Sequence, residues 1–577
     1  MTTRFEPVVT RAGADGSRAL TEVDPITTEI VRHGLNSAAN QMKQALIRTA
    51  FSPIIYEVLD FAVAIYDDDV RLLAQAPSLP IFMGTMSFCV EAAVAAVGGR
   101  ERLEPGDIIL YNDPYGSGSH PQDAALIMPV FLDENLVGYT AIKAHWLDIG
   151  AKDPYATDTV DVFQEGVIFP GVKLYSRGQR VDDVYRTVLA NSRMPAAVEG
   201  DIRAEITGVR TGGEALLRLI RRYGLVDFKQ AVEHMFDHAE ATVRRYFEEI
   251  PDGQYRGFGM MDDNGVEPDP VPFEVVLEVK GSTVQIDYSN APGQQRGPIN
   301  CPLPSTVSAS RVAISMLAGA GEAPNEGHMR PVEIKTRPGT LFHPLPPAPC
   351  FLCGWPTIQA IEVIYHAISQ ALPHAVTACS GGDICGLTLY GVRKDTGEPW
   401  TDGSPHPVGQ GGHIYGDGGT MMHVSESATR FPATEVWESK NPIIMEKVEL
   451  AQDSCGAGEH RGGLGIDFFF HALDDFFITA AVERTKTAPW GLLGGAEGRP
   501  NAAAVRYPNG ERTFIGKATR LPVPKGATLE YYTGGGGGYG EPAEREEAAI
   551  RKDLREGYLS ESYVRQHFPQ LKLEEGS

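Results

Sequence analysis

Two histidines and one aspartate in the N-terminal half of the chain have the residue types and spacing of a metal site. His120 and Asp123 stand three positions apart in a turn rich in glycine and proline, and His145 follows the apolar stretch that begins after Asp123. Neutral imidazoles together with a carboxylate suit Zn²⁺, Mn²⁺ or Fe²⁺, and such a set leaves a coordination position for water or substrate. The spacing alone also fits polar turn residues that only cap strand ends, because His-x-x-Asp is a common pattern.

Two strands joined by a short turn would bring these three side chains together. Residues 124–131 and 137–144 are apolar and tolerant of β structure, and residues 132–136 separate them. We therefore expect the second strand to return His145 to the side of His120 and Asp123. Asp148 follows three positions later, and we expect it either to orient a ligand histidine by hydrogen bonding or to cap a turn.

The remaining elements predict an α+β (mixed α/β) protein. It is expected to be multi-lobed, with an N-terminal metal-bearing α/β unit and a Gly-rich, strand-rich C-terminal part. Helical periodicity occurs in several segments, namely residues 25–50, 228–249, 306–317 and 357–371. Strand patterns occur in others, namely residues 60–67, 108–111, 273–279, 284–288, 448–450, 468–473, 477–482 and 527–532.

A chain of 577 residues is too long for one simple core. The composition changes along the chain predict five segments. They are an N-terminal arm (1–24), a metal-bearing α/β unit (25–250), a middle α/β unit (251–400), a Gly-rich and β-rich unit (401–545) and a helical C-terminal tail (546–577).

The bulk composition excludes several classes of protein. The formal net charge of −24 argues against a nucleic-acid binder, which needs basic groups to displace the counterions of phosphates. No apolar run approaches the roughly 20 residues of a membrane helix, and the first residues lack the apolar stretch of a secretory signal. The 7 cysteines are scattered and odd in number, which favours reduced thiols and a cytoplasmic location.

Other candidate motifs have simpler explanations. Cys350 and Cys353 form a CxxC pair, but no second pair lies at the spacing of a zinc ribbon, so we expect a structural or incidental role. His234 and His238 are four positions apart on a predicted helix, yet Met235 stands where a metalloprotease needs glutamate. An exposed helix face explains that pair better.

Two glycine-rich segments permit close backbone approach to a ligand or to another segment. Asp383, His413 and Asp417 lie in or near residues 409–419 and could line a substrate pocket, although ordinary turns explain them better. The unbroken glycine run at residues 534–538 predicts a tight backbone contact and has no evident chemical role.

These motifs together resemble the hydantoinase B/5-oxoprolinase family, which comprises the B subunits of ATP-dependent hydantoinases such as N-methylhydantoinase. Acetone and acetophenone carboxylases contain related subunits. The resemblance runs from residue 25 to about residue 565. It is carried by the segments 60–67, 112–123, 129–131, 145–150, 163–166, 453–465, 490–495 and 533–540.

The resemblance implies a metal site formed by Asp60, His120, Asp123 and His145. We expect His120, Asp123 and His145 to be the catalytic residues, together with Asp148 from the same segment. It also implies a partner A subunit that uses ATP and Mg²⁺ to phosphorylate the amide oxygen of a small cyclic amide. This chain would then complete the hydrolysis within a hetero-oligomer such as A2B2. The chain has no Gly-x-x-x-x-Gly-Lys-Ser/Thr loop, which is consistent with ATP being bound elsewhere.

Two alternatives to a cyclic amide hydrolase remain open. One is a subunit of an ATP-dependent ketone carboxylase, in which the same metal would bind an enolate or a species derived from carboxyphosphate. The other is a non-catalytic scaffold that stabilises an A subunit and holds no stoichiometric metal.

Overall fold

The computed structural model describes residues 8–11, 23–319, 321–422 and 429–573. The chain forms two compact units. The first comprises Met1–Pro154, Thr159–Arg256 and Phe273–Ile361, and the second comprises Tyr155–Asp158, Gly257–Pro272 and Glu362–Ser577. Both contain sheets and helices, which confirms the predicted α+β class. The five-segment division stays a prediction, and most of its N-terminal arm lies outside the described residues.

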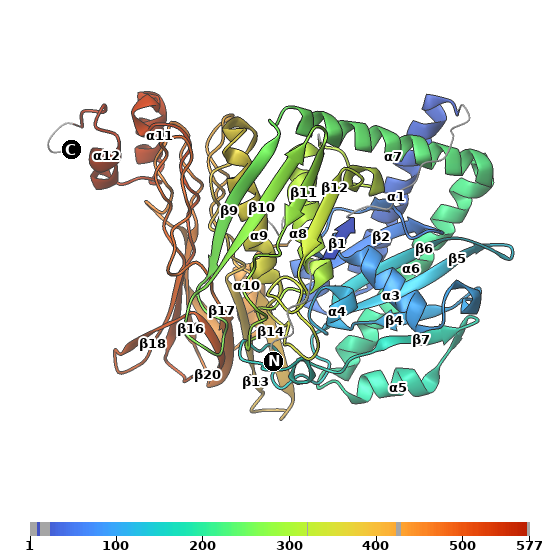
Figure 1. The fold of residues 1–577 in the computed structure, drawn as a ribbon. Coiled ribbons are helices and arrows are strands. Elements are labelled where there is room, and N and C mark those ends of the chain that lie inside the picture. The colour runs from blue at the N-terminus through green and yellow to red at the C-terminus, as the bar shows by residue number, and fades with distance from the viewer. Residues whose placement is uncertain (1–7, 12–22, 320, 423–428, 574–577) are drawn as a thin grey trace, which may run out of the picture. The chain divides into compact units, whose positions relative to one another are not determined.

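The first unit is built on an antiparallel sheet that has seven strands within the described residues (Figure 1). In spatial order its strands are β3 (Leu72–Gln75), β2 (Phe61–Asp67), β6 (Asn135–His145), β5 (Asp123–Leu132), β4 (Ile108–Tyr111), β7 (Pro170–Ser176) and β8 (Gln179–Arg180). The central strands β2, β6, β5 and β4 are almost entirely buried, which explains why their sequences are largely apolar.

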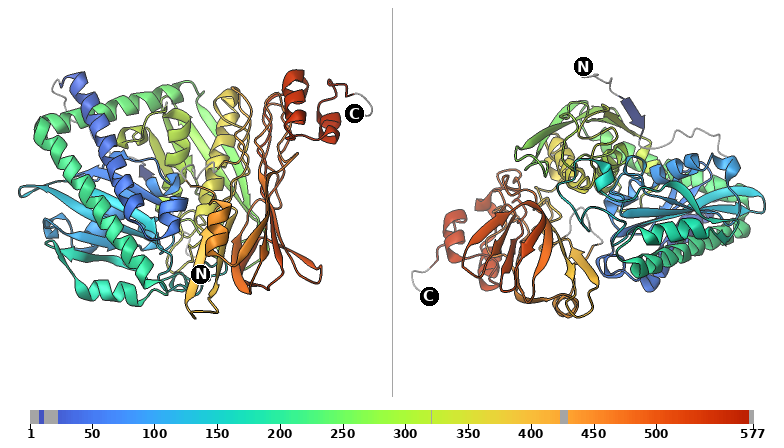
Figure 2. Two further views of the ribbon diagram at one scale, coloured as in Figure 1. Left: turned by 180° about the vertical axis from the view of Figure 1, so that it is seen from behind. Right: turned by 90° about the horizontal axis from the view of Figure 1, so that it is seen from below.

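Helices cover both faces of this sheet. On one face, α1 (Pro25–Thr49) packs against α6 (Pro195–Tyr223), as the left view of Figure 2 shows, and α7 (Leu225–Glu248) packs on α1. On the other face, α3 (Met86–Ala96) contacts β4 and β7. The short helices of this unit are α2 (Pro80–Met83), α4 (Pro114–Ser117) and α5 (Asp182–Ala190).

The first unit also contains most of a second sheet, which consists of β1 and of strands that follow residue 250. Its order is β1 (Val8–Arg11), β12 (Val332–Thr336), β11 (Thr283–Asp287), β10 (Val271–Lys280) and β9 (Gly253–Met261). The helices of this region are α8 (Leu303–Ala318) and α9 (Gly354–Ser369). Strands β10 and β11 pair antiparallel around a turn at Gly281, which agrees with the two strands predicted at residues 273–279 and 284–288. Strand β9 and helix α9 each begin in the first unit and end in the second.

The second unit contains two antiparallel sheets in its described residues. One has the order β14 (Pro399–Ser404), β13 (Gly386–Val392), β17 (Phe476–Ala481), β20 (Lys517–Val523). The other has the order β15 (Ile443–Leu450), β16 (Ile466–Ala472), β21 (Thr528–Tyr532), β18 (Ala502–Arg506), β19 (Arg512–Ile515). The helices are α10 (Thr434–Lys440), α11 (Glu547–Arg555) and α12 (Glu561–His567), and the last two lie in the C-terminal stretch predicted to be helical.

The glycine run lies at the centre of a bundle of extended segments within the second unit. The N–H groups of Gly535, Gly536, Gly537 and Gly538 donate to carbonyl oxygens on three other segments, at Arg499 and Ala496 of one loop, at Gly463 and at Cys379. A Cβ atom on Gly536 would lie 1.9 Å from the carbonyl oxygen of Gln410, so only glycine allows this approach. The predicted tight backbone contact is confirmed.

Among the described residues, no helix combines the length and the apolar character needed to cross a bilayer.

Candidate metal centre

Strands β5 and β6 form the hairpin that carries the candidate site. Their register places Asp123 directly opposite His145, at the end of the hairpin remote from its turn. The turn is tight, and Asp133 adopts a φ of 54° there. Because paired residues of antiparallel strands point to the same face, the two side chains are neighbours despite their separation in sequence.

A loop that follows α4 delivers His120. Gly118 takes a φ of 69°, which turns the chain sharply after the helix, and the N–H of Asp123 donates to the carbonyl oxygen of His120 at 3.0 Å. The buried Lys143 ammonium donates to the carbonyl oxygen of Ser117 at 2.8 Å, so a strand residue near His145 also anchors the start of the loop. The loop is therefore fixed at both ends.

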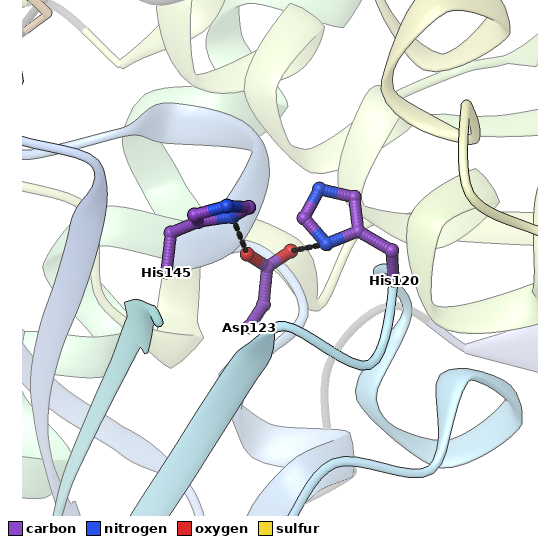
Figure 3. A group of neighbouring side chains, drawn as sticks. All are labelled: His120, Asp123 and His145. Carbon is purple, nitrogen blue, oxygen red and sulfur yellow. Dashed lines mark hydrogen bonds and ion pairs between the residues drawn. The ribbon is translucent and has the colours of Figure 1, made fainter. Parts of the chain in front are cut away.

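The three side chains converge on one point (Figure 3). His145 Nδ1 lies 2.9 Å from Asp123 Oδ1, and His120 Nδ1 lies 3.3 Å from Asp123 Oδ2. The two imidazole rings meet edge to face, with centroids 4.9 Å apart. One potential ligand atom from each residue can be chosen so that all lie within 4.8 Å of one another. The structure thus brings together His120, Asp123 and His145.

Burial and mutual charge set the protonation of this cluster. Burial lowers the pKa of His120 to about 4, so its ring is neutral at neutral pH. Burial opposes charge on Asp123 and on His145, but neighbouring groups outweigh it. Attraction to His120 and His145 lowers the pKa of Asp123, and the Asp123 carboxylate, with Asp60, raises the pKa of His145. The carboxylate is therefore ionised, as a metal ligand must be.

Asp60 approaches the cluster more loosely. It follows Leu59, whose φ is 68°, and precedes β2, and its Oδ2 atom lies 4.0 Å from His145 Nδ1. Its Oδ1 atom is buried and accepts no hydrogen bond from the described residues. Burial raises the pKa of Asp60 to about 7, and the neighbouring Asp123 carboxylate adds to the shift. Its predicted role as a ligand stays a prediction.

The donor set fits a divalent transition metal. Two imidazoles and one or two carboxylates form the nitrogen and oxygen set that Zn²⁺, Mn²⁺ and Fe²⁺ accept. Oδ1 of Asp60 is buried without a hydrogen-bond donor among the described residues, and Oδ2 of Asp123 is also buried. A cation would offset the energetic cost of burying these two oxygens. Nothing in the donor set selects one of these metals over the others.

Asp148 is engaged elsewhere in the structure. Its carboxylate accepts from Nε of Arg193 at 3.0 Å and from the backbone N–H of the same residue, and the N–H of Gly150 donates to it at 3.4 Å. These contacts fasten the segment after β6 to the segment before α6. The predicted role of Asp148 toward a ligand histidine stays a prediction.

Phe351 is a site residue that the sequence patterns did not indicate. Its ring stacks on that of His120 with centroids 4.7 Å apart and an interplanar angle of 20°. The CxxC motif drew attention to the flanking Cys350 and Cys353, which are buried free thiols. Phe351 lies far from His120 in sequence, and an aromatic residue between two cysteines carries no signal of such a contact.

The other candidates lie outside the cluster. On α7, His238 is exposed and 3.3 Å from Glu322, as expected, whereas His234 is half-buried with a buried Nε2 atom, so the prediction of an exposed face is wrong for that residue. In the second unit, Asp417 pairs with Arg545 at 2.7 Å, and Asp383 accepts the backbone N–H of Ile384 at 2.8 Å. These contacts are those of ordinary loop architecture.

The chain is similar to known proteins over nearly its whole length. Residues 24–542 match the family described as hydantoinase B/oxoprolinase. The beta chain of the caprolactamase of Pseudomonas jessenii is 29% identical over 552 residues, which cover 93% of this chain and 94% of that protein. The 5-oxoprolinase of Dictyostelium discoideum is 25% identical, and the match covers 92% of this chain but 41% of that longer protein.

Solved structures agree with the sequence matches. The crystal structure of the ATP-dependent caprolactamase from Pseudomonas jessenii aligns with a TM-score of 0.88 at 28% identity, covering 96% of this chain and 98% of that one. The nucleotide-free structure of acetone carboxylase aligns with a TM-score of 0.84 at 17% identity, covering 96% of this chain and 80% of that one, a likeness of fold alone. Since the family match spans nearly the whole length, this chain belongs to the hydantoinase B/oxoprolinase family.

Proposed function

We propose that this chain is the metal-dependent catalytic B subunit of an ATP-dependent cyclic amide hydrolase of the hydantoinase/5-oxoprolinase type. Its substrate would be a lactam or cyclic imide whose amide oxygen a partner A subunit phosphorylates with ATP and Mg²⁺. The observation that carries the proposal is the convergence of His120, Asp123 and His145 at the end of the β5–β6 hairpin. Family membership and the likeness to a lactam-hydrolysing relative support it.

His120, Asp123 and Phe351 would each have a distinct role at such a site. His120 is kept neutral by burial and so presents a lone pair, while Asp123 lies between the two rings and holds both. Phe351 covers one face of the His120 ring and keeps water from it. A divalent ion bound there would supply a Lewis acid that polarises the activated amide and lowers the pKa of water toward ~7.

The ketone carboxylase is the second candidate. The fold likeness to acetone carboxylase supports it, but that likeness covers 80% of the other chain, against 98% for the caprolactamase. We therefore favour hydrolysis. A non-catalytic scaffold is the third candidate, and it predicts a protein without stoichiometric metal.

One reconstitution experiment separates these candidates. The chain is co-purified with an A-like ATP-binding subunit and assayed with ATP plus hydantoin, 5-oxoproline or caprolactam, and in parallel with ATP, bicarbonate and acetone. We expect ring opening that depends on both subunits, and its loss together with bound metal in His120→Ala. Carboxylation without ring opening would favour the second candidate, and full ring-opening activity of a metal-free His120→Ala protein would contradict the metal-dependent hydrolase.

A further inference from the structure

Glu165 carries a fully buried carboxyl group that no step of the proposed reaction uses. Its Oε1 atom accepts the backbone N–H groups of Cys350 at 2.8 Å and Phe351 at 2.9 Å, and the hydroxyl of Thr159 at 2.8 Å. Its Oε2 atom also lies 3.0 Å from the N–H of Cys350. Burial raises the pKa of Glu165 to about 8, but each of these donors favours the carboxylate.

These hydrogen bonds fix the backbone from which the Phe351 side chain projects. Neighbouring parts of the same loop are held by neutral groups. The hydroxyl of Tyr115 donates to the carbonyl oxygen of Ala348 at 2.6 Å, and the N–H of Leu352 donates to that of Pro298 at 2.9 Å. At Phe351 itself the backbone N–H donates to Glu165, so this carboxylate helps to set the direction in which the ring projects.

The Phe351 ring in turn limits the orientation of His120. The two rings are nearly parallel, and His120 also meets His145 edge to face. A histidine ring can rotate about its terminal side-chain torsion, which has broad minima. Packing against two rings restricts that rotation and leaves Nδ1 facing Asp123 at 3.3 Å.

We propose that Glu165 is a positioning residue for the metal centre, acting through the backbone of Phe351 and the stacking of its ring on that of His120. The hydrogen bonds of its carboxyl group go to Cys350, Phe351 and Thr159, and to none of the candidate metal ligands. The proposal rests on the proposed function only where metal binding is the readout, because the orientation of the His120 ring can be measured without metal.

The first measurement is made on the metal-free protein. With histidine labelled at Cε1, the His120 resonance is identified by its loss in His120→Ala. Stacking under Phe351 shifts this resonance upfield through the ring current. We expect Phe351→Leu to remove the shift and Glu165→Gln to reduce it, since the glutamine amide keeps one accepting oxygen but turns a donor toward the N–H of Cys350.

The second measurement is the dissociation constant for Zn²⁺, obtained against a competing chelator. Partners that orient metal ligands typically contribute about 10–100-fold in affinity. We expect Glu165→Gln and Phe351→Leu each to weaken binding by about tenfold or more. The double variant should be no weaker than Phe351→Leu alone, because Glu165 acts through that ring.

Asp107→Asn serves as the matched control. Asp107 is also fully buried and accepts two backbone N–H groups, those of Glu104 at 3.0 Å and Arg177 at 2.9 Å, but it contacts none of the candidate ligands. It should change neither the His120 resonance nor the affinity for Zn²⁺. Circular dichroism on each variant identifies any that fails to fold, and Glu165→Gln is used in place of the more disruptive Glu165→Ala because it keeps the size of the side chain.

An unchanged His120 resonance in folded Glu165→Gln would overturn the proposal. So would strictly additive losses of Zn²⁺ affinity in the double variant. If the wild-type protein binds no metal while the resonance still responds to Glu165→Gln, the proposed function fails and the positioning role stands. If metal binds and neither readout responds, the positioning role fails and the proposed function stands.

Discussion

At the scale of residues, Asp123 is the member of the cluster that contacts both histidines. Its two carboxylate oxygens face different imidazoles, and it is fully buried. The contact with His145 follows directly from strand register, whereas the contact with His120 depends on the loop after α4. The pairing of Asp123 with His145 could be predicted because the residues between them form one hairpin. The stacking of Phe351 could not, since it depends on a distant loop.

We expect Asp123→Asn to reduce the affinity for Zn²⁺ by more than the roughly 10–100-fold typical of partners that only orient ligands. The substitution preserves volume but removes a charge and turns an amide N–H₂ toward one of the two histidines. Titration against a chelator measures the effect. Asp262→Asn, at a buried carboxylate of the second unit, is the control. Equal affinity in wild type and Asp123→Asn would rule out Asp123 as a ligand.

At the scale of elements, the positions of β2, β4, β5, β6, α1 and α7 agree closely with the sequence patterns. These elements are continuous apolar runs or have a regular helical period. The longest helix of the first unit, α6, was not predicted, because it contains several glycines that weaken a helical pattern. The structure explains two of them. A Cβ atom on Gly208 would lie 2.3 Å from Ile142 Cδ1, and one on Gly212 would lie 2.3 Å from Met42 Sδ.

The packing of α6 on the end of β6 contains a buried carboxyl group that predicts a pH dependence. Glu205 accepts the indole N–H of Trp146 at 2.6 Å, and burial holds its pKa well above the usual value. At pH values above the pKa that Glu205 has in the unfolded chain, its raised pKa in the folded state means that the folded protein binds more protons than the unfolded chain. Stability contributed by Glu205 is therefore present at low pH and is lost as pH rises toward the folded pKa.

We expect the melting temperature of Glu205→Gln, relative to wild type, to increase between pH 5 and pH 8, because glutamine cannot ionise. Thermal unfolding followed by circular dichroism at several pH values measures the difference. Glu214→Gln, at an exposed position of the same helix, should give a difference that does not vary with pH in this way. A relative melting temperature of Glu205→Gln that falls as pH rises would contradict the assignment.

The bundle of extended segments around the glycine run at residues 534–538 leads to a second prediction at the scale of elements. Gly536→Ala should destabilise the second unit by about 1–3 kcal/mol or more, because the added methyl group collides with backbone atoms that cannot rotate away. Gly516→Ala in the same unit is the control, since the nearest atom to its added Cβ, the carbonyl oxygen of Val482, lies 3.6 Å away. Denaturant unfolding compares the two, and equal stability would show that the bundle tolerates side chains.

At the scale of the whole molecule, the proposed function joins one metal centre in this chain to ATP chemistry in a partner. The caprolactamase relative is itself one chain of a multi-chain enzyme, which supports a partner for this chain as well. If the native state binds a metal that the unfolded chain does not, metal contributes to stability by mass action, by about 2.7 kcal/mol at a free concentration 100 times the dissociation constant. A chelator should therefore lower the melting temperature of the wild-type protein.

The same chelator treatment should leave the melting temperature of His145→Ala unchanged, since that variant has no complete site from which metal can be removed. Differential scanning calorimetry, with and without the chelator, gives both values. An equal decrease in wild type and variant would indicate that any stabilising metal binds elsewhere in the chain.

The most direct test of the metal centre is crystallographic. Diffraction data collected from the metal-loaded protein above and below the absorption edge of Zn, Mn or Fe locate the metal by anomalous scattering. We predict one peak about 2.0–2.2 Å from a ring nitrogen of His120, a ring nitrogen of His145 and an oxygen of Asp123. A metal-loaded crystal with no peak between these three residues would contradict the proposed centre.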